Sequence, residues 1–182
     1  MNAQKAIFMR RTIHSFENKK VSKNIIKNAI EAANQAPCHK LTYPWRFYSV
    51  GEKKRIQILD LAMEIKSKNK QLDDKLKNII KEKFLNPSHL LIASQRLNID
   101  QIIRKEDYAA CSCAIQNLSI SLTAEGVFTK WSTGSITTNP KTYKIANINP
   151  TEEEIIGFIW IGHGKPSLKI QRPLIDQIYK EI

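Results

Sequence analysis

Hydrophobic residues recur at helical spacing over most of this chain and gather as in strands over a few short segments. One apolar face predicts a helix from Lys23 to about Gln35, with Ser22 as its N-cap. A broader apolar face predicts a helix from about Asp107 to Glu125, with Gly126 as its C-cap. Small residues on this second helix permit close approach of another helix, so we expect it at the centre of the fold or where two copies meet.

The remaining elements follow from residue type and from helix-breaking positions. Further helices are predicted over 3–9, about 52–68, about 72–84 and from Asn139-Pro140 onward. Three strands are predicted over 45–50, 89–94 and 155–161, whereas 131–134 is interpreted as a short polar turn. The tail from 165 to 182 has only a weak helical pattern. With no repeat, linker or composition change, residues 1–182 are predicted to form a single α+β domain.

Positive charge exceeds negative charge by 12, with 29 Lys and Arg residues against 17 Asp and Glu residues. Such an excess raises the possibility of a nucleic-acid partner. The lysines of the predicted helices over 52–84 are, however, spread around helical turns and interleaved with acidic residues, and no helix-turn-helix or RNP-like motif accompanies them. A solvated lysine-rich face is the preferred interpretation, so nucleic acid is not expected as a partner. A small phosphate-bearing cofactor is compatible with this charge.

Several common kinds of site are missing from the sequence. The six glycines form neither a dinucleotide-binding fingerprint nor a P-loop, and no zinc-protease or serine-hydrolase motif occurs. The four histidines lack ligand spacing, and three cysteines without paired CxxC motifs predict neither a disulfide framework nor a metal site. No signal peptide or membrane-spanning run is found, so we expect a cytoplasmic protein without a membrane partner. The chemistry is therefore expected to come from a bound cofactor.

Three short segments carry groups suited to binding such a cofactor. Arg10, Arg11 and Thr12 can grip a phosphate through two guanidiniums and a hydroxyl, although a basic surface turn has the same composition. The polar loop between Pro37 and Pro44 can hold a planar ligand rigidly, or it is an ordinary helix-to-strand connection. Segment 131–134 offers hydroxyls and backbone amides to the carbonyl oxygens of a ring system, or it is a turn with a packed tryptophan.

In this order and spacing, the three segments resemble the nitroreductase family, in particular its compact NAD(P)H nitroreductases. The motifs are Arg10 to Phe16, Ala36-Pro37-Cys38-His39 followed by Pro44-Trp45-Arg46-Phe47, and Trp131-Ser132-Thr133-Gly134. The resemblance runs almost end to end. It implies a nitroreductase-like fold, in which helices surround a small, central, mostly antiparallel sheet. It also implies an intertwined homodimer with FMN at the subunit interface.

The resemblance also assigns roles to individual residues. The FMN phosphate and ribityl chain would be held by Arg10, Arg11 and Thr12, with Arg172 as a further phosphate ligand and Lys169 behind it. The flavin would be reached from the second subunit by Gln35 and His39. The isoalloxazine ring and its polar edge would lie along Trp131, Ser132 and Thr133. The nicotinamide cofactor would contact Ser121, Leu122, Thr123, Ala124, Glu125 and Gly126. No side chain is expected to act as a catalyst, because flavin N5 carries the chemistry.

The resemblance implies an FMN-dependent NAD(P)H oxidoreductase. It would reduce nitroaromatic, quinone or similar small electrophilic acceptors by ping-pong hydride transfer through flavin N5. Four positions depart from the family pattern. Thr12 replaces the commoner Ser and keeps the hydroxyl, His14 stands where relatives often carry Arg or Lys, and Gln35 and Ser132 stand where close relatives carry Arg. The loss of two guanidiniums motivates an alternative function, a flavin-binding sensor or carrier with little turnover.

Overall fold

The computed structural model describes residues 1–68, 71–166 and 170–182. Its helices and strands follow one another along the chain as α1 (Ala3–Met9), α2 (Lys23–Asn34), η1 (His39–Leu41), β1 (Trp45–Ser49), α3 (Glu52–Ser67), α4 (Asp74–Leu85), β2 (His89–Arg96), α5 (Gln101–Ala124), β3 (Phe128–Ser132), α6 (Ser135–Thr138), α7 (Pro140–Ala146), β4 (Glu153–Gly162) and η2 (Ile175–Gln177). The molecule is α+β, as predicted.

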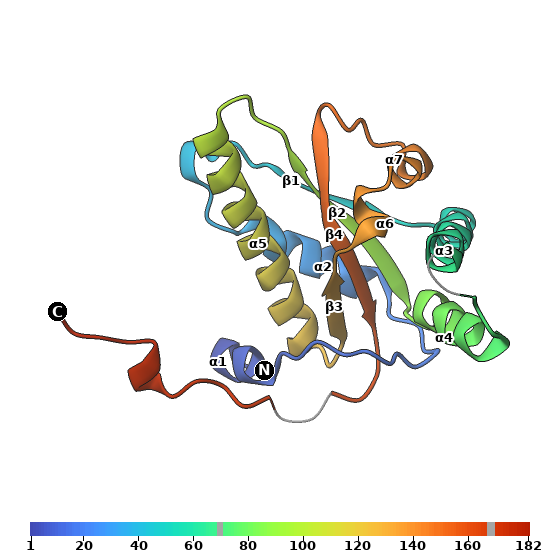
Figure 1. Cartoon of the computed structure of the whole chain (residues 1–182). Helices are drawn as coiled ribbons and strands as arrows, with labels where there is room; N and C mark the ends of the chain where they lie inside the picture. The colour runs from blue at the N-terminus through green and yellow to red at the C-terminus, as the bar shows by residue number, and fades with distance from the viewer. Residues whose placement is uncertain (69–70, 167–169) are drawn as a thin grey trace.

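The four strands form one antiparallel sheet in the order β1-β2-β4-β3. Side chains alternate between the two faces of the sheet. Along β2, Leu91 and Ala93 pack with α2 and α5, while Leu90 and Ile92 pack with α3 and α4. Figure 1 shows the same arrangement, with α2 and α5 on one side of the sheet and α3, α4, α6 and α7 on the other. Both faces are therefore covered, and each has its own apolar core.

Helix α5 is the longest element, and it packs against both α2 and the sheet. It begins at Gln101, six positions before the predicted start, because Asp100 caps it by accepting hydrogen bonds from the N–H groups of Ile102 and Ile103. It ends at Ala124, one position before the predicted end. There Glu125 takes the C-cap position, and Gly126 follows with a φ of 72°, which glycine adopts without strain.

The predicted type of one segment is wrong. Segment 131–134 is not a turn throughout, because Trp131 and Ser132 complete the strand β3, which hydrogen-bonds along β4. The sheet consequently has four strands where three were predicted.

The tail beyond β4 leaves the body of the molecule. In Figure 1 it runs past α1 and ends far from the sheet, and its described part contains only the short helix η2. Several of its large apolar side chains are exposed, among them Leu174, Ile175 and Ile178. Among the described residues, no helix combines the length and the apolar character that crossing a membrane requires.

Candidate functional site

The segment that carries Arg10, Arg11 and Thr12 lies along the outer edge of β3. Thr12 forms a parallel bridge with Thr129, and the N–H of Ile13 donates to the carbonyl oxygen of Thr129 at 3.3 Å. These contacts fix the backbone of the basic segment against the sheet. The first predicted group of cofactor residues is thereby held in one conformation beside the third group, which is in and just after β3.

Three guanidiniums gather at this edge. Burial lowers the pKa of Arg10, and the positive charges of Arg172 and Arg11 lower it further. Arg11 donates to the carbonyl oxygens of Phe8 and Arg10 at 2.7 and 2.8 Å. Among the described residues, none of the three arginines forms an ion pair with a carboxylate. An anion at this place would remove the mutual repulsion, so the donor set fits a phosphate group.

A second group of cations lies on and beside β3. The ammonium of Lys130, on β3, donates to Nδ1 of His14 at 3.1 Å. Burial lowers the pKa of Lys130, and it lowers the pKa of Lys83 together with the charges of Lys130 and Lys66. A cavity of about 250 Å³ opens beside them, lined by His14, Ser15, Phe16, Ile79, Glu82, Lys83 and Asn86. Lys83 and Lys130 were missed by the sequence analysis, because nothing in the pattern distinguishes them from the many solvated lysines.

Two side chains of the third predicted group already form hydrogen bonds within the subunit. The indole N–H of Trp131 donates to the carbonyl oxygen of Ile156 at 3.1 Å, and the hydroxyl of Ser132 accepts from the indole of Trp160 at 2.8 Å. Thr133 is exposed directly after β3. Contact of this segment with a flavin stays a prediction, and it would involve the backbone and Thr133 more readily than the occupied side-chain groups.

The residues predicted to reach the flavin from a second subunit lie elsewhere. Gln35 is the exposed C-cap of α2. His39 lies in η1, and its Nδ1 is 2.9 Å from Oε2 of Glu106 on α5. Glu106 was not among the predicted site residues, and only the fold brings it to His39.

The two halves of the expected site lie at opposite ends of α5 in one subunit. His39 contacts α5 at Glu106, whereas Thr129, the neighbour of Thr12, donates to Ser119 at 3.2 Å. Glu106 and Ser119 are 13 positions apart, which corresponds to about 20 Å along a helix. The structure therefore does not bring His39 and the basic segment together within one subunit.

The segment predicted to contact the nicotinamide cofactor is partly inaccessible. Leu122 and Thr123 are buried in the core, and the hydroxyl of Thr123 donates to the carbonyl oxygen of Ser119. Only Ser121, Ala124, Glu125 and Gly126 of this segment reach the surface to some extent. Lys169, expected behind Arg172, lies outside the described residues. The described part of the chain contains no group of three His, Cys, Asp or Glu side chains able to hold a metal ion.

Comparison with known proteins identifies the family. The model of the nitroreductase family matches residues 7–163, which is most of the chain. The chain belongs to the nitroreductase family. The match includes the basic segment, the loop containing His39 and the strands β3 and β4.

Individual nitroreductase relatives agree with this assignment. A Bacillus subtilis (strain 168) protein named "Putative NAD(P)H nitroreductase YfhC" is 28% identical over 173 residues, covering 92% of this chain and 88% of its own. The crystal structure of a nitroreductase-like family protein from Bacillus cereus superposes with a TM-score of 0.86 at 25% identity, covering 100% and 96% of the two chains. The FMN- and NADPH-dependent nitroreductase NfnB from Sphigopyxis sp. strain HMH has a TM-score of 0.83 at 13% identity, covering 100% and 99%. The nitroreductase fold is thus present over the whole chain.

Proposed function

We propose that this nitroreductase family member is an FMN-dependent NAD(P)H oxidoreductase that works as a homodimer. Its acceptors would be nitroaromatic compounds, quinones or similar small electrophiles. The observation that carries the proposal is the cluster of Arg10, Arg11 and Arg172, which is ion-paired with no carboxylate in the described structure. The names of relatives, which include FMN, NADPH and NAD(P)H, support the choice of cofactors.

In this proposal, the protein binds and orients the cofactor and supplies positive charge. When bound, FMN would provide the hydride carrier, which takes electrons from a nicotinamide donor and passes them to the acceptor through N5 in a ping-pong cycle. The arginine cluster would hold the phosphate. Lys130 and Lys83 would add positive potential beside β3, which favours a negatively charged reduced ring. No side-chain nucleophile is needed.

The separation of the two half-sites favours a symmetric pair of subunits. In a two-fold symmetric dimer with antiparallel α5 helices, the Glu106 level of one copy would face the Ser119 level of the other. The loop with His39 would then meet the partner's basic segment. The outer stripe of α5 suits such a contact, because it is mostly small or uncharged: Ile102, Lys105, Ala109, Cys113, Gln116 and Ile120.

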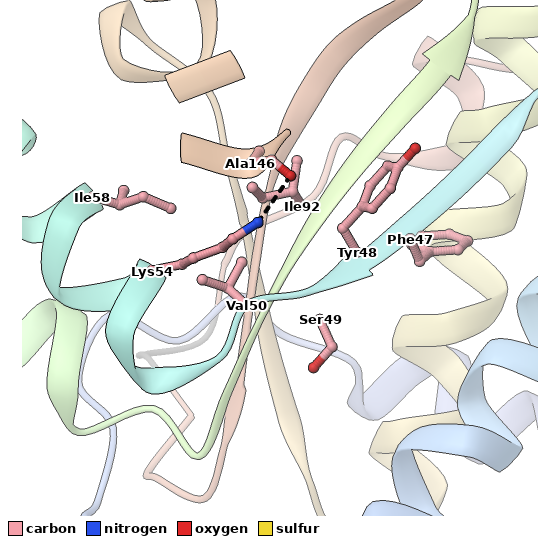
Figure 2. A pocket seen from close by; sticks show the side chains of 8 residues that line it. All are labelled: Phe47, Tyr48, Ser49, Val50, Lys54, Ile58, Ile92 and Ala146. Atoms are coloured by element: carbon pink, nitrogen blue, oxygen red, sulfur yellow. Dashed lines mark hydrogen bonds between the residues drawn. The ribbon is translucent and has the colours of Figure 1, made fainter. Parts of the chain in front are cut away.

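The tail supports an intertwined arrangement. Its exposed apolar side chains have no cover within the subunit, and burying them against a second copy would be favourable. The tail could pack at the outer edge of β1. This strand pairs with β2 on its inner side, and no strand of the described chain pairs with its outer side. Beside this edge lies an apolar cavity of about 260 Å³ between β1, α3 and the end of α7, with Lys54 at Ala146 (Figure 2).

The visible spectrum of the purified protein tests the cofactor. We expect a flavin band, and we expect the flavin released on denaturation to be FMN; FAD or a colourless protein would overturn the assignment. Arg10→Ala should weaken FMN binding by about 2–5 kcal/mol, because it removes a partly buried partner of the phosphate. The matched control is Arg96→Ala, at the exposed end of β2, which should bind FMN like the wild type.

The uncharged side chains of Gln35 and Ser132 favour a second function. Neither supplies a cation, and the hydroxyl of Ser132 is already hydrogen-bonded to Trp160. With less positive charge around the ring, the protein would serve as a flavin sensor or carrier. Steady-state oxidation of NADH or NADPH with a nitroaromatic or quinone acceptor separates the two functions. FMN-loaded protein without turnover would favour the sensor or carrier.

A further inference from the structure

The loop from Cys38 to Tyr43 has an unusual backbone. Lys40, Leu41 and Tyr43 have φ angles of 62°, 52° and 44°, although none is glycine. Such conformations are uncommon for residues with a Cβ, and they persist only where the surroundings enforce them. Leu41 and Tyr43 are also exposed, so burial of their own side chains does not enforce the conformation.

Two adjacent carboxyl groups of α5 hold this loop. The hydroxyl of Thr42 donates to Asp107, whose side chain is buried, and it also contacts Sγ of Cys38 at 3.3 Å. Sγ of Cys38 in turn accepts from the N–H of Tyr43 at 3.3 Å. One position earlier on α5, Glu106 pairs with His39. Both ends of the strained segment are therefore fastened to the same turn of one helix.

The contact with Glu106 also orients the ring of His39. Nδ1 points at the carboxylate and donates its proton there, so the Nε2 edge is left for whatever covers the loop. The His39 side chain is 64% exposed, and an ion pair this exposed adds little to stability. Stability is thus a poor explanation for an arrangement that also strains the backbone and buries a carboxyl group.

We propose that Glu106 and Asp107 are positioning residues that hold the loop 38–43 so that His39 presents Nε2 across the subunit interface to the bound flavin. Asp107 acts through Thr42, and Glu106 acts through His39. The inference rests on the proposed function, since it takes FMN as the group that His39 meets. It adds residues of α5 that touch neither the cofactor nor the acceptor.

FMN release from the purified holoprotein tests the positioning role. Glu106→Ala and Thr42→Val should each accelerate FMN release about tenfold on dilution, followed by the rise of flavin fluorescence. Glu154→Ala is the matched control, because it removes a comparably exposed ion pair from the same end of α5, that of Arg104 and Glu154 at 2.7 Å, which includes no residue of the loop. The control should release FMN like the wild type, and equal acceleration in all three variants would overturn the proposal.

A double-mutant cycle with His39→Ala separates positioning from a general structural effect. Because Glu106 acts through His39, Glu106→Ala should change FMN release no further once His39 is absent. Additive effects would contradict the proposed route.

The nitrogen resonances of the His39 ring supply a readout that needs no flavin. Neutral His39 should carry its proton on Nδ1 in the wild type and in Glu154→Ala, and it should lose this preference in Glu106→Ala. An unchanged tautomer in Glu106→Ala would refute the positioning of His39 by Glu106, even if FMN binds. A wild type with the expected tautomer but no FMN would instead refute the proposed cofactor, and with it the target of His39.

Discussion

Gly157 of β4 lies against the indole of Trp131 on the neighbouring strand. A Cβ atom at this position would lie 2.1 Å from Nε1 of Trp131, far inside contact distance. Gly157→Ala would therefore push the indole away from the carbonyl oxygen of Ile156 and disturb β3. We expect it to lower the free energy of unfolding by about 1–3 kcal/mol, measured by urea denaturation.

Gly51→Ala is the control for this substitution. Gly51 caps α3 with an ordinary φ of −68°, and a Cβ there would meet no atom within 4 Å. It should leave stability nearly unchanged. Equal stability of the two variants would mean that the sheet adjusts to the added methyl group and that Trp131 is not confined.

The buried thiol of Cys111 predicts a loss of stability at alkaline pH. Burial raises its pKa from 9.0 to about 12, and Asp107 and Cys38 contribute to the increase. The unfolded chain releases this proton from about pH 9 upward, whereas the folded chain keeps it until about pH 12, so stability falls as pH rises through this window. Between pH 9 and 10.5, the wild type should lose about 1 kcal/mol per pH unit more than Cys111→Ala in urea unfolding. Parallel pH profiles of the two proteins would rule out this origin.

For helices and strands, the sequence correctly predicted those ends that are determined by nearby capping residues. Ser22 caps α2 by accepting from Ile25, and Asn139 followed by Pro140 begins α7, because capping groups act within a few residues. The start of α5 was placed too late because the charged run from Arg104 to Asp107 interrupts the apolar pattern after Ile102 and Ile103. β3 was missed because it is short and mixes polar with aromatic residues, and its pairing with β4 comes from distant positions.

The residues of the candidate site also fall into those that the sequence could predict and those that only the fold reveals. Arg10, Arg11 and Thr12 could be selected because the motif is contiguous and resembles a known family. Glu106 and Asp107 could not, because their contacts with His39 and Thr42 join residues 67 and 65 positions apart. Lys83 and Lys130 could not either, since their pKa values are lowered by burial and, for Lys83, by the charges of Lys130 and Lys66, which only the fold brings near.

The outer stripe of α5 predicts a covalent link between copies. Cys113 is exposed and lies midway between Glu106 and Ser119, so it would fall near the two-fold axis of the proposed dimer. Oxidation with diamide should therefore yield a disulfide-linked dimer on a non-reducing gel. Cys113→Ser should abolish this band and Cys38→Ser should keep it. A band that depends on Cys38 instead would place a different surface at the axis.

For the whole molecule, the tail provides the simplest test of assembly. Removing residues 173–182 deletes apolar side chains that are exposed in the single subunit, so the folded core should survive. We expect the truncated protein to elute as a monomer, or as a much weaker dimer, in size-exclusion chromatography and to lose FMN. Deletion of the tail without any change in elution or flavin content would show that it takes no part in the interface.

The distance between the two halves of the site along α5 has a genetic consequence. A copy with Arg10→Ala still carries an intact His39, and a copy with His39→Ala still carries an intact basic segment. When both are produced in one cell, each mixed pair would contain one complete pocket and one doubly damaged pocket. Two defective alleles should thus complement each other, and differently tagged, co-purified pairs should hold close to one FMN per two chains.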